Sequence, residues 1–158
     1  MTSLILDECD SLIEIPDVSC LSNLENLSFA RCQNLLTIHR SVGLLEMLKI
    51  LDALNYQELK SFPPLKLTSL EQFEVSYCVS LGSEFKVIPE CIEKCRFLTT
   101  LTLDYCGGLQ EIRGIPPNLK HFSTLHDPAL TSSSISMLLN LMNYLWLTGT
   151  AWGWRHQL

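Results

Sequence analysis

A pattern of mostly apolar residues recurs six times along the 158-residue chain and constrains its fold more than any other feature. In each copy two such residues are separated by one residue that points outward, which suits a short strand with one buried face. The first residues of the six pairs are Leu4, Leu27, Leu51, Phe73, Leu101 and Phe122, in steps of 23, 24, 22, 28 and 21 residues. Eight positions after each of these stands a leucine: Leu12, Leu35, Leu59, Leu81, Leu109 and Leu130. Because an unrelated sequence rarely fills such a column with one residue type, the chain is a repeat array.

The length of the repeat identifies its type. Steps of about 20–29 residues are typical of leucine-rich repeats. The sequence therefore predicts an α/β fold: a leucine-rich-repeat solenoid with a short parallel β-strand per repeat on the concave face and irregular or short helical convex segments. We expect about six repeats over residues 1–134, truncated at the N-terminus. The first coil has no polar segment to cover it, which favours a fragment of a longer protein.

Two regions depart from the regular repeat. The fourth repeat is longer than its neighbours, and we expect its extra residues, at 82–89, on the convex side or edge. The segment from Glu90 to Cys95 predicts one helical turn. Residues 135–158 form an apolar tail that contains all three tryptophans. Its apolar run is too short to span a bilayer. Three alternatives stay open for it: a helical cap on the last coil, an element on a membrane surface, or the product of an altered reading frame.

The cysteines favour a structural role. Four of the seven occupy the same position in different repeats: Cys9, Cys32, Cys78 and Cys106. We predict buried thiols there, and Cys95 replaces a leucine of the core. Cys91 and Cys95 lack a second ligand pair at zinc-site spacing, so no metal site is expected. The odd number of cysteines and the absence of a signal peptide predict a cytoplasmic protein, with the nucleus left open.

No catalytic or cofactor motif is present in the sequence. The four histidines are scattered, and neither a nucleophile motif nor a glycine-rich phosphate loop occurs. We therefore expect a protein that is not an enzyme and uses no cofactor. The net charge of -6 argues against nucleic acid as a partner.

The outward strand positions form the candidate site. Side chains alternate across a strand, so the residues between and just after each buried pair point away from the core. They create a mostly acidic strip in which Tyr77 and Tyr105 are candidate aromatic anchors. The predicted partner-binding residues are Asp7, Glu8, Arg31, Asp52, Asn55, Glu74, Tyr77, Asp104, Tyr105 and His126. One interpretation is docking of a basic protein surface. The other is a solvated face with no partner.

Two segments, Leu21–Leu35 and Ile112–Lys120, resemble the leucine-rich region of plant intracellular immune receptors. The most similar class carries a Toll/interleukin-receptor (TIR) domain and a nucleotide-binding domain ahead of the repeats. The resemblance implies effector sensing, autoinhibition of the nucleotide-binding switch and a defence response. It implies a protein partner: a pathogen effector, a guarded host protein or the receptor's nucleotide-binding domain. Those two domains do not occur in this chain, so their activities are not carried over. The alternative function is a truncated structural remnant or small adaptor without independent activity.

Overall fold

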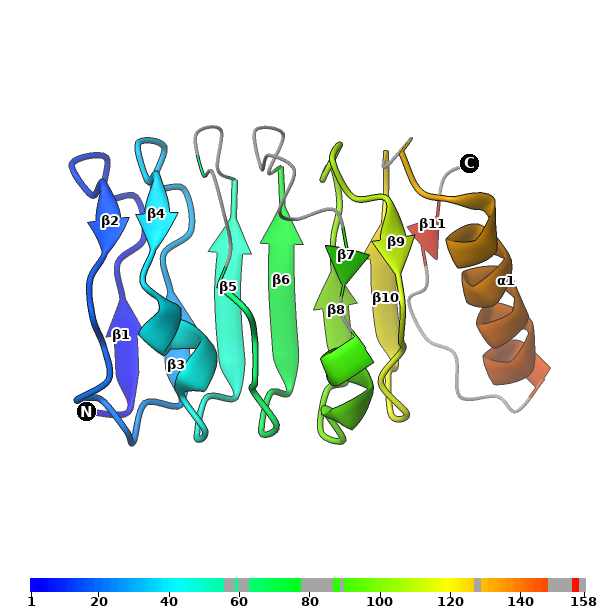
Figure 1. Cartoon of the computed structure of the whole chain (residues 1–158), viewed down its shortest axis with the longest axis horizontal. Coiled ribbons are helices and arrows are strands. Elements are labelled where there is room, and N and C mark those ends of the chain that lie inside the picture. The colour runs from blue at the N-terminus through cyan, green and yellow to red at the C-terminus, as the bar shows by residue number, and fades with distance from the viewer. Residues whose placement is uncertain are drawn as a thin grey trace.

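Successive coils contribute neighbouring strands to one parallel sheet, which runs the length of the molecule (Figure 1). The computed structural model describes residues 1–55, 59, 63–77, 87–88, 90–126, 129–147 and 155–156. The seven-stranded sheet has the order β1-β3-β5-β6-β8-β10-β11. Its strands are β1 (Ser3–Ile5), β3 (Asn26–Ser28), β5 (Ile50–Leu54), β6 (Gln72–Ser76), β8 (Thr100–Thr102), β10 (His121–Thr124) and β11 (Arg155–His156).

The strand register follows the repeat that the sequence predicts. Leu4 lies opposite Leu27, which lies opposite Leu51. Leu51 pairs with Phe73, Phe73 with Leu101, and Leu101 with Phe122. The six predicted strand positions are therefore neighbours in one column, and the predicted leucine-rich solenoid is confirmed.

The core lies beneath this sheet and consists of stacked apolar columns. Leu27, Leu51 and Leu101 are buried, as are the second-column leucines Leu35, Leu59 and Leu109. In the first coil, the equivalent Leu4, Leu6 and Leu12 are only partly buried. A residue in a solenoid is covered from both sides by adjacent coils, so the first coil has one such neighbour where the inner coils have two.

The convex side is more regular than predicted. Two-residue strands β2 (Glu14–Ile15) and β4 (Thr37–Ile38) pair in parallel, as do β7 (Val87–Ile88) and β9 (Glu111–Ile112). Extended return segments of adjacent coils lie at strand spacing, so their backbone groups satisfy one another. The predicted helical turn is the 3₁₀ helix η2 (Glu90–Lys94), and a second, η1 (Arg40–Leu44), was not anticipated. Most of the extra residues predicted at 82–89 lie outside the described residues, as does Cys78.

The C-terminal tail forms helix α1 (Ser132–Leu147), which packs on the last coil (Figure 1). Its first turn is held by the Thr131 hydroxyl, which accepts a hydrogen bond from the Ser134 N–H at 3.4 Å. The Ser134 hydroxyl accepts a bond from Ile112 N–H at 3.0 Å, and Leu138 is buried in the core. Beyond the helix, β11 adds a strand to the free edge of β10. Trp152 and Trp154 lie outside the described residues.

Candidate protein-binding surface

All ten predicted binding residues lie in three columns at the strands. Counted from the first buried residue of each strand, Asp52 and Glu74 come one position later. Asp7 and Asp104 come three positions later. The remaining six come four positions later: Glu8, Arg31, Asn55, Tyr77, Tyr105 and His126. We call these last six residues the edge column, and all ten together the ridge.

Every residue of the edge column adopts a left-handed backbone conformation. Their φ angles lie between 57° and 66°. A backbone bond to the next coil accompanies this conformation in Glu8, Arg31, Asn55, Tyr77 and Tyr105. For example, Glu8 N–H donates to Ala30 O at 2.8 Å, and Arg31 N–H donates to Leu54 O at 2.8 Å. The chain then turns off the sheet and sends the next residue inward. Sequence reasoning missed this conformation, because none of the six is glycine and four of them, Glu8, Arg31, Tyr77 and Tyr105, are types that rarely adopt it.

The two halves of the edge column make different contacts. In the N-terminal half, Arg31 Nη1 forms an exposed ion pair with Glu8 Oε1 at 2.9 Å. In the C-terminal half, the rings of Tyr77 and Tyr105 stack with their centroids 4.4 Å apart and planes 10° apart. His126 stacks on Tyr105 at 4.6 Å and 29°. The first half thus neutralises its own charge, whereas the second half presents aromatic rings.

Two predicted acidic residues hold adjacent coils together. The Asp7 carboxylate accepts hydrogen bonds from the Ser28 hydroxyl and, at 3.0 Å, from Ala30 N–H. The Asp104 carboxylate accepts a bond from Leu125 N–H at 2.8 Å. In both cases the acceptor caps a backbone donor of the next coil, a structural role that the sequence did not reveal.

Asp52 is the most perturbed acid of the ridge. Parallel register places it directly beside Glu74 on the next strand. Burial, and after it the negative charges of Glu74 and Asp7, raises the pKa of Asp52 from 3.8 to about 6. Its Oδ1 atom is buried and has no hydrogen-bond partner among the described residues. Like charges directly opposite one another destabilise a sheet, so this pair opposes folding.

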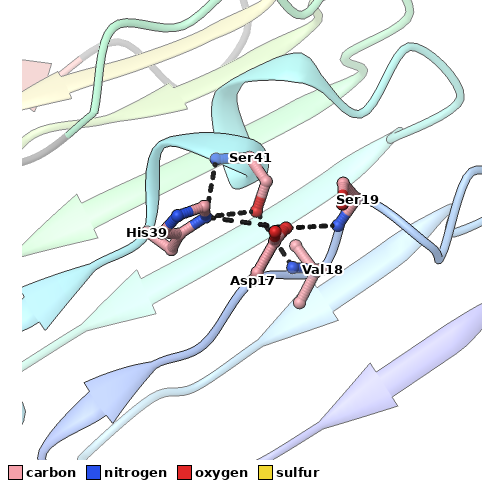
Figure 2. Close-up of polar contacts among 5 residues, drawn as sticks. All are labelled: Asp17, Val18, Ser19, His39 and Ser41. Carbon is pink, nitrogen blue, oxygen red and sulfur yellow. Dashed lines mark hydrogen bonds and ion pairs between the residues drawn. The ribbon is translucent and has the colours of Figure 1, made fainter.

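A polar cluster on the other side of the solenoid resembles a catalytic triad in composition only (Figure 2). His39 Nδ1 lies 3.6 Å from Asp17 Oδ1 and 2.9 Å from Ser41 Oγ. A Ser-His-Asp triad needs the two partners on different ring nitrogens, whereas here both approach Nδ1. Ser41 is also buried and accepts a bond from Val18 N–H at 2.9 Å. The cluster caps η1 and joins two coils.

The described cysteines mostly occupy the predicted core. Cys32, Cys95 and Cys106 are buried, which confirms that prediction, and Cys9 in the first coil is partly buried. The Cys32 thiol donates to Leu6 O of the preceding coil at 3.0 Å, and burial raises its pKa. A protonated thiol is thus maintained as the donor. The side chain of Cys91 lies outside what the structure describes.

Two other kinds of site do not occur among the described residues. These residues contain no cluster of three or more His, Cys, Asp or Glu side chains arranged to bind a metal. None of the helices in that part of the chain is long and apolar enough to cross a membrane. One hollow of about 450 Å³ lies between β9 and α1 and is lined by residues that include Arg113 and Ser133.

The aligned coils and leucine columns define a leucine-rich-repeat solenoid. The chain is similar to disease resistance protein RPS6 of Arabidopsis thaliana, with 29% identity over 122 residues, which are 77% of this chain and 10% of RPS6. It is also similar to disease resistance protein RPP5 of the same plant, with 29% identity over 126 residues, or 79% of this chain and 8% of RPP5. No family model matches the chain.

These relatives confirm the resemblance to the leucine-rich region of TIR-type nucleotide-binding disease resistance proteins. The chain spans a tenth or less of the length of the curated relatives that it matches.

Proposed function

We propose that this chain is a protein-recognition and regulatory segment of a plant innate immune receptor, with the ridge as its binding surface. The relatives named for disease resistance support this role. Its partner is a pathogen effector, a guarded host protein or the nucleotide-binding domain of the receptor. In the last case, binding holds the nucleotide-binding switch inactive until a defence response is triggered. The chain acts by binding and not by catalysis.

The observation that carries this proposal is the pair Asp52 and Glu74. The two residues are neighbours on adjacent strands, and neither forms an ion pair within the described part of the chain. Asp52 has a buried oxygen without a partner. A local arrangement that opposes folding is typical of residues that are retained for function. A cationic partner surface relieves the repulsion between the two carboxylates.

The proposal places the protein in the cytoplasm, with the nucleus as a second compartment. The described cysteines Cys9, Cys20, Cys32, Cys95 and Cys106 are free thiols. Free thiols are the usual state in a reducing compartment.

Calorimetric titration with the nucleotide-binding domain of a TIR-type resistance protein tests the regulatory role. The ridge variant carries Asp52→Lys and Glu74→Lys. The control variant carries Glu14→Lys and Glu46→Lys, which make the same change in net charge at exposed positions away from the ridge. We expect saturable binding by the wild type and the control, and binding at least tenfold weaker by the ridge variant.

The other outcomes are equally informative. Equal weakening in both variants contradicts a specific ridge and indicates a response to net charge alone. A folded wild type that does not bind eliminates autoinhibition through this domain and leaves effector or host-protein recognition. A wild type that is unfolded by circular dichroism supports the structural remnant.

A further inference from the structure

The C-terminal half of the edge column is an ordered stack of rings at the surface. Tyr77, Tyr105 and His126 succeed one another at 4.4 and 4.6 Å, which matches the spacing of the strands that carry them. Tyr77 is 49% exposed even though one of its faces is covered by Tyr105. The stack therefore ends in an accessible aromatic face, directed toward the third coil.

The next edge-column position in that direction is Asn55. Its backbone follows the same path as that of Tyr77, since the two φ angles are 66° and 57°. The side chain of asparagine ends at an amide, well short of the length of a tyrosine ring. The edge column thus has no ring at position 55 to continue the stack. The amide oxygen of Asn55 can accept a hydrogen bond from a group that lies there.

The charges around this position favour a cation. Asp52 and Glu74 lie on the two strands that carry Asn55 and Tyr77, about three residues or 10 Å earlier along each strand. Arg31 precedes Asn55 in the edge column, and its positive charge is balanced by the ion pair with Glu8. Aromatic faces attract cations through the ring quadrupole, and guanidinium groups also stack as planes.

We propose that the exposed face of Tyr77 stacks the guanidinium of an arginine from an extended basic segment of the partner, which occupies the position above Asn55 as the next plane of the Tyr77–Tyr105–His126 stack. This inference rests on the proposed function, because it names the residue that the ridge recognises. Burial, and after it the neighbouring Tyr77, raises the pKa of Tyr105, so this phenol stays neutral within the stack. A second arginine or a lysine two to three residues away along the partner segment meets Asp52 and Glu74.

Three peptides of one length test this arrangement: acetyl-Gly-Arg-Gly-Arg-Gly-amide, its lysine counterpart and its citrulline counterpart. Citrulline keeps the planar shape without the charge, and lysine keeps the charge without the plane. Titrations are followed by NMR on the whole chain with labelled tyrosine rings. We expect the arginine peptide to shift the Tyr77 ring signals and to bind several-fold more tightly than either counterpart.

Variants of the chain assign the contact. Tyr77→Ala is expected to weaken binding of the arginine peptide about tenfold, whereas Tyr77→Phe, which keeps the ring, retains it. Phe97→Ala removes an exposed ring outside the ridge and is expected to have no effect. Glu74→Gln is expected to weaken the arginine and lysine peptides alike.

The outcomes separate this inference from the proposed function. If Glu74→Gln weakens both cationic peptides but Tyr77→Ala does not discriminate between them, the acidic ridge stands and the stacking is refuted. If arginine and lysine peptides bind equally well to the wild type, the stacking is also refuted. Absence of binding by all three peptides overturns the inference, and the titration with the nucleotide-binding domain then decides the proposed function independently.

Discussion

Replacing Asp52 with asparagine is expected to stabilise the folded chain at neutral pH, although Asp52 belongs to the ridge. Its pKa is raised from 3.8 to about 6, chiefly by burial and then by Glu74 and Asp7. The folded chain therefore holds this proton more tightly than the unfolded chain does. Ionisation of Asp52 lowers the free energy of unfolding as pH rises from about 4 to about 6, and the loss is complete above that pH.

The size of the gain follows from the pKa shift. A shift of about 2 units corresponds to roughly 3 kcal/mol at about 1.4 kcal/mol per unit. Asp52 is only partly buried, so solvent and salt reduce this figure to about 1–2 kcal/mol. For a chain of this size, such a gain raises the midpoint of thermal unfolding by roughly 2–8 °C.

Urea unfolding of the wild type and Asp52→Asn across the acidic range measures the effect. We expect the full difference in unfolding free energy at about pH 7.5 and a small fraction of it at about pH 4, where the wild-type carboxyl is protonated in the folded state. Asp104→Asn is the matched control, because Asp104 caps Leu125 N–H and its replacement brings no comparable gain. An Asp52→Asn variant that is no more stable than the wild type at pH 7.5, or equally stabilised at both pH values, refutes the reasoning.

Three further predictions concern the scaffold, and thermal unfolding with circular dichroism checks each. Gly43→Ala is expected to destabilise the fold by about 2 kcal/mol or more, because the new methyl group collides with the carbonyl oxygen of Pro64, whereas Gly107→Ala has open space and little effect; equal melting points contradict this packing. At the left-handed position 31, Arg31→Val is expected to be at least about 1 kcal/mol less stable than Arg31→Gly, and the reverse order contradicts the backbone assignment. Cys32→Ala is expected to cost about 1–2 kcal/mol, since it removes a buried thiol and its hydrogen bond, and an unchanged melting point refutes that role.

The solenoid could be predicted from the sequence because it meets the same burial constraint in every coil. The strand residues Leu4, Leu27 and Leu51 stand in one column, and the structure pairs them as their spacing predicts. The convex strands could not be predicted in this way. Ile15 and Ile38 are single apolar residues in two-residue strands. Such a short strand cannot show the alternation of apolar and polar residues that identifies a strand in a sequence.

The candidate surface was predictable in position but not in conformation or contacts. Asp7 and Asp52 are the same residue type on the same face, yet Asp7 is bonded to Ser28 and Ala30 whereas Asp52 has a buried oxygen without a partner among the described residues. The difference depends on which hydrogen-bond donors of the next coil lie near each carboxylate, and only the three-dimensional structure shows them. The left-handed edge column was equally hidden, since four of its six residues, Glu8, Arg31, Tyr77 and Tyr105, are types that rarely adopt this conformation.

Site-specific photo-crosslinking tests the claim that the ridge is the binding surface most directly. A benzoyl-phenylalanine is placed either at Tyr77 on the ridge or at Phe97, which is exposed outside it. Each variant is irradiated with the nucleotide-binding domain of a TIR-type resistance protein, and the adducts are located by mass spectrometry. The account predicts adducts from position 77 and few from position 97. Adducts formed mainly from position 97 contradict it.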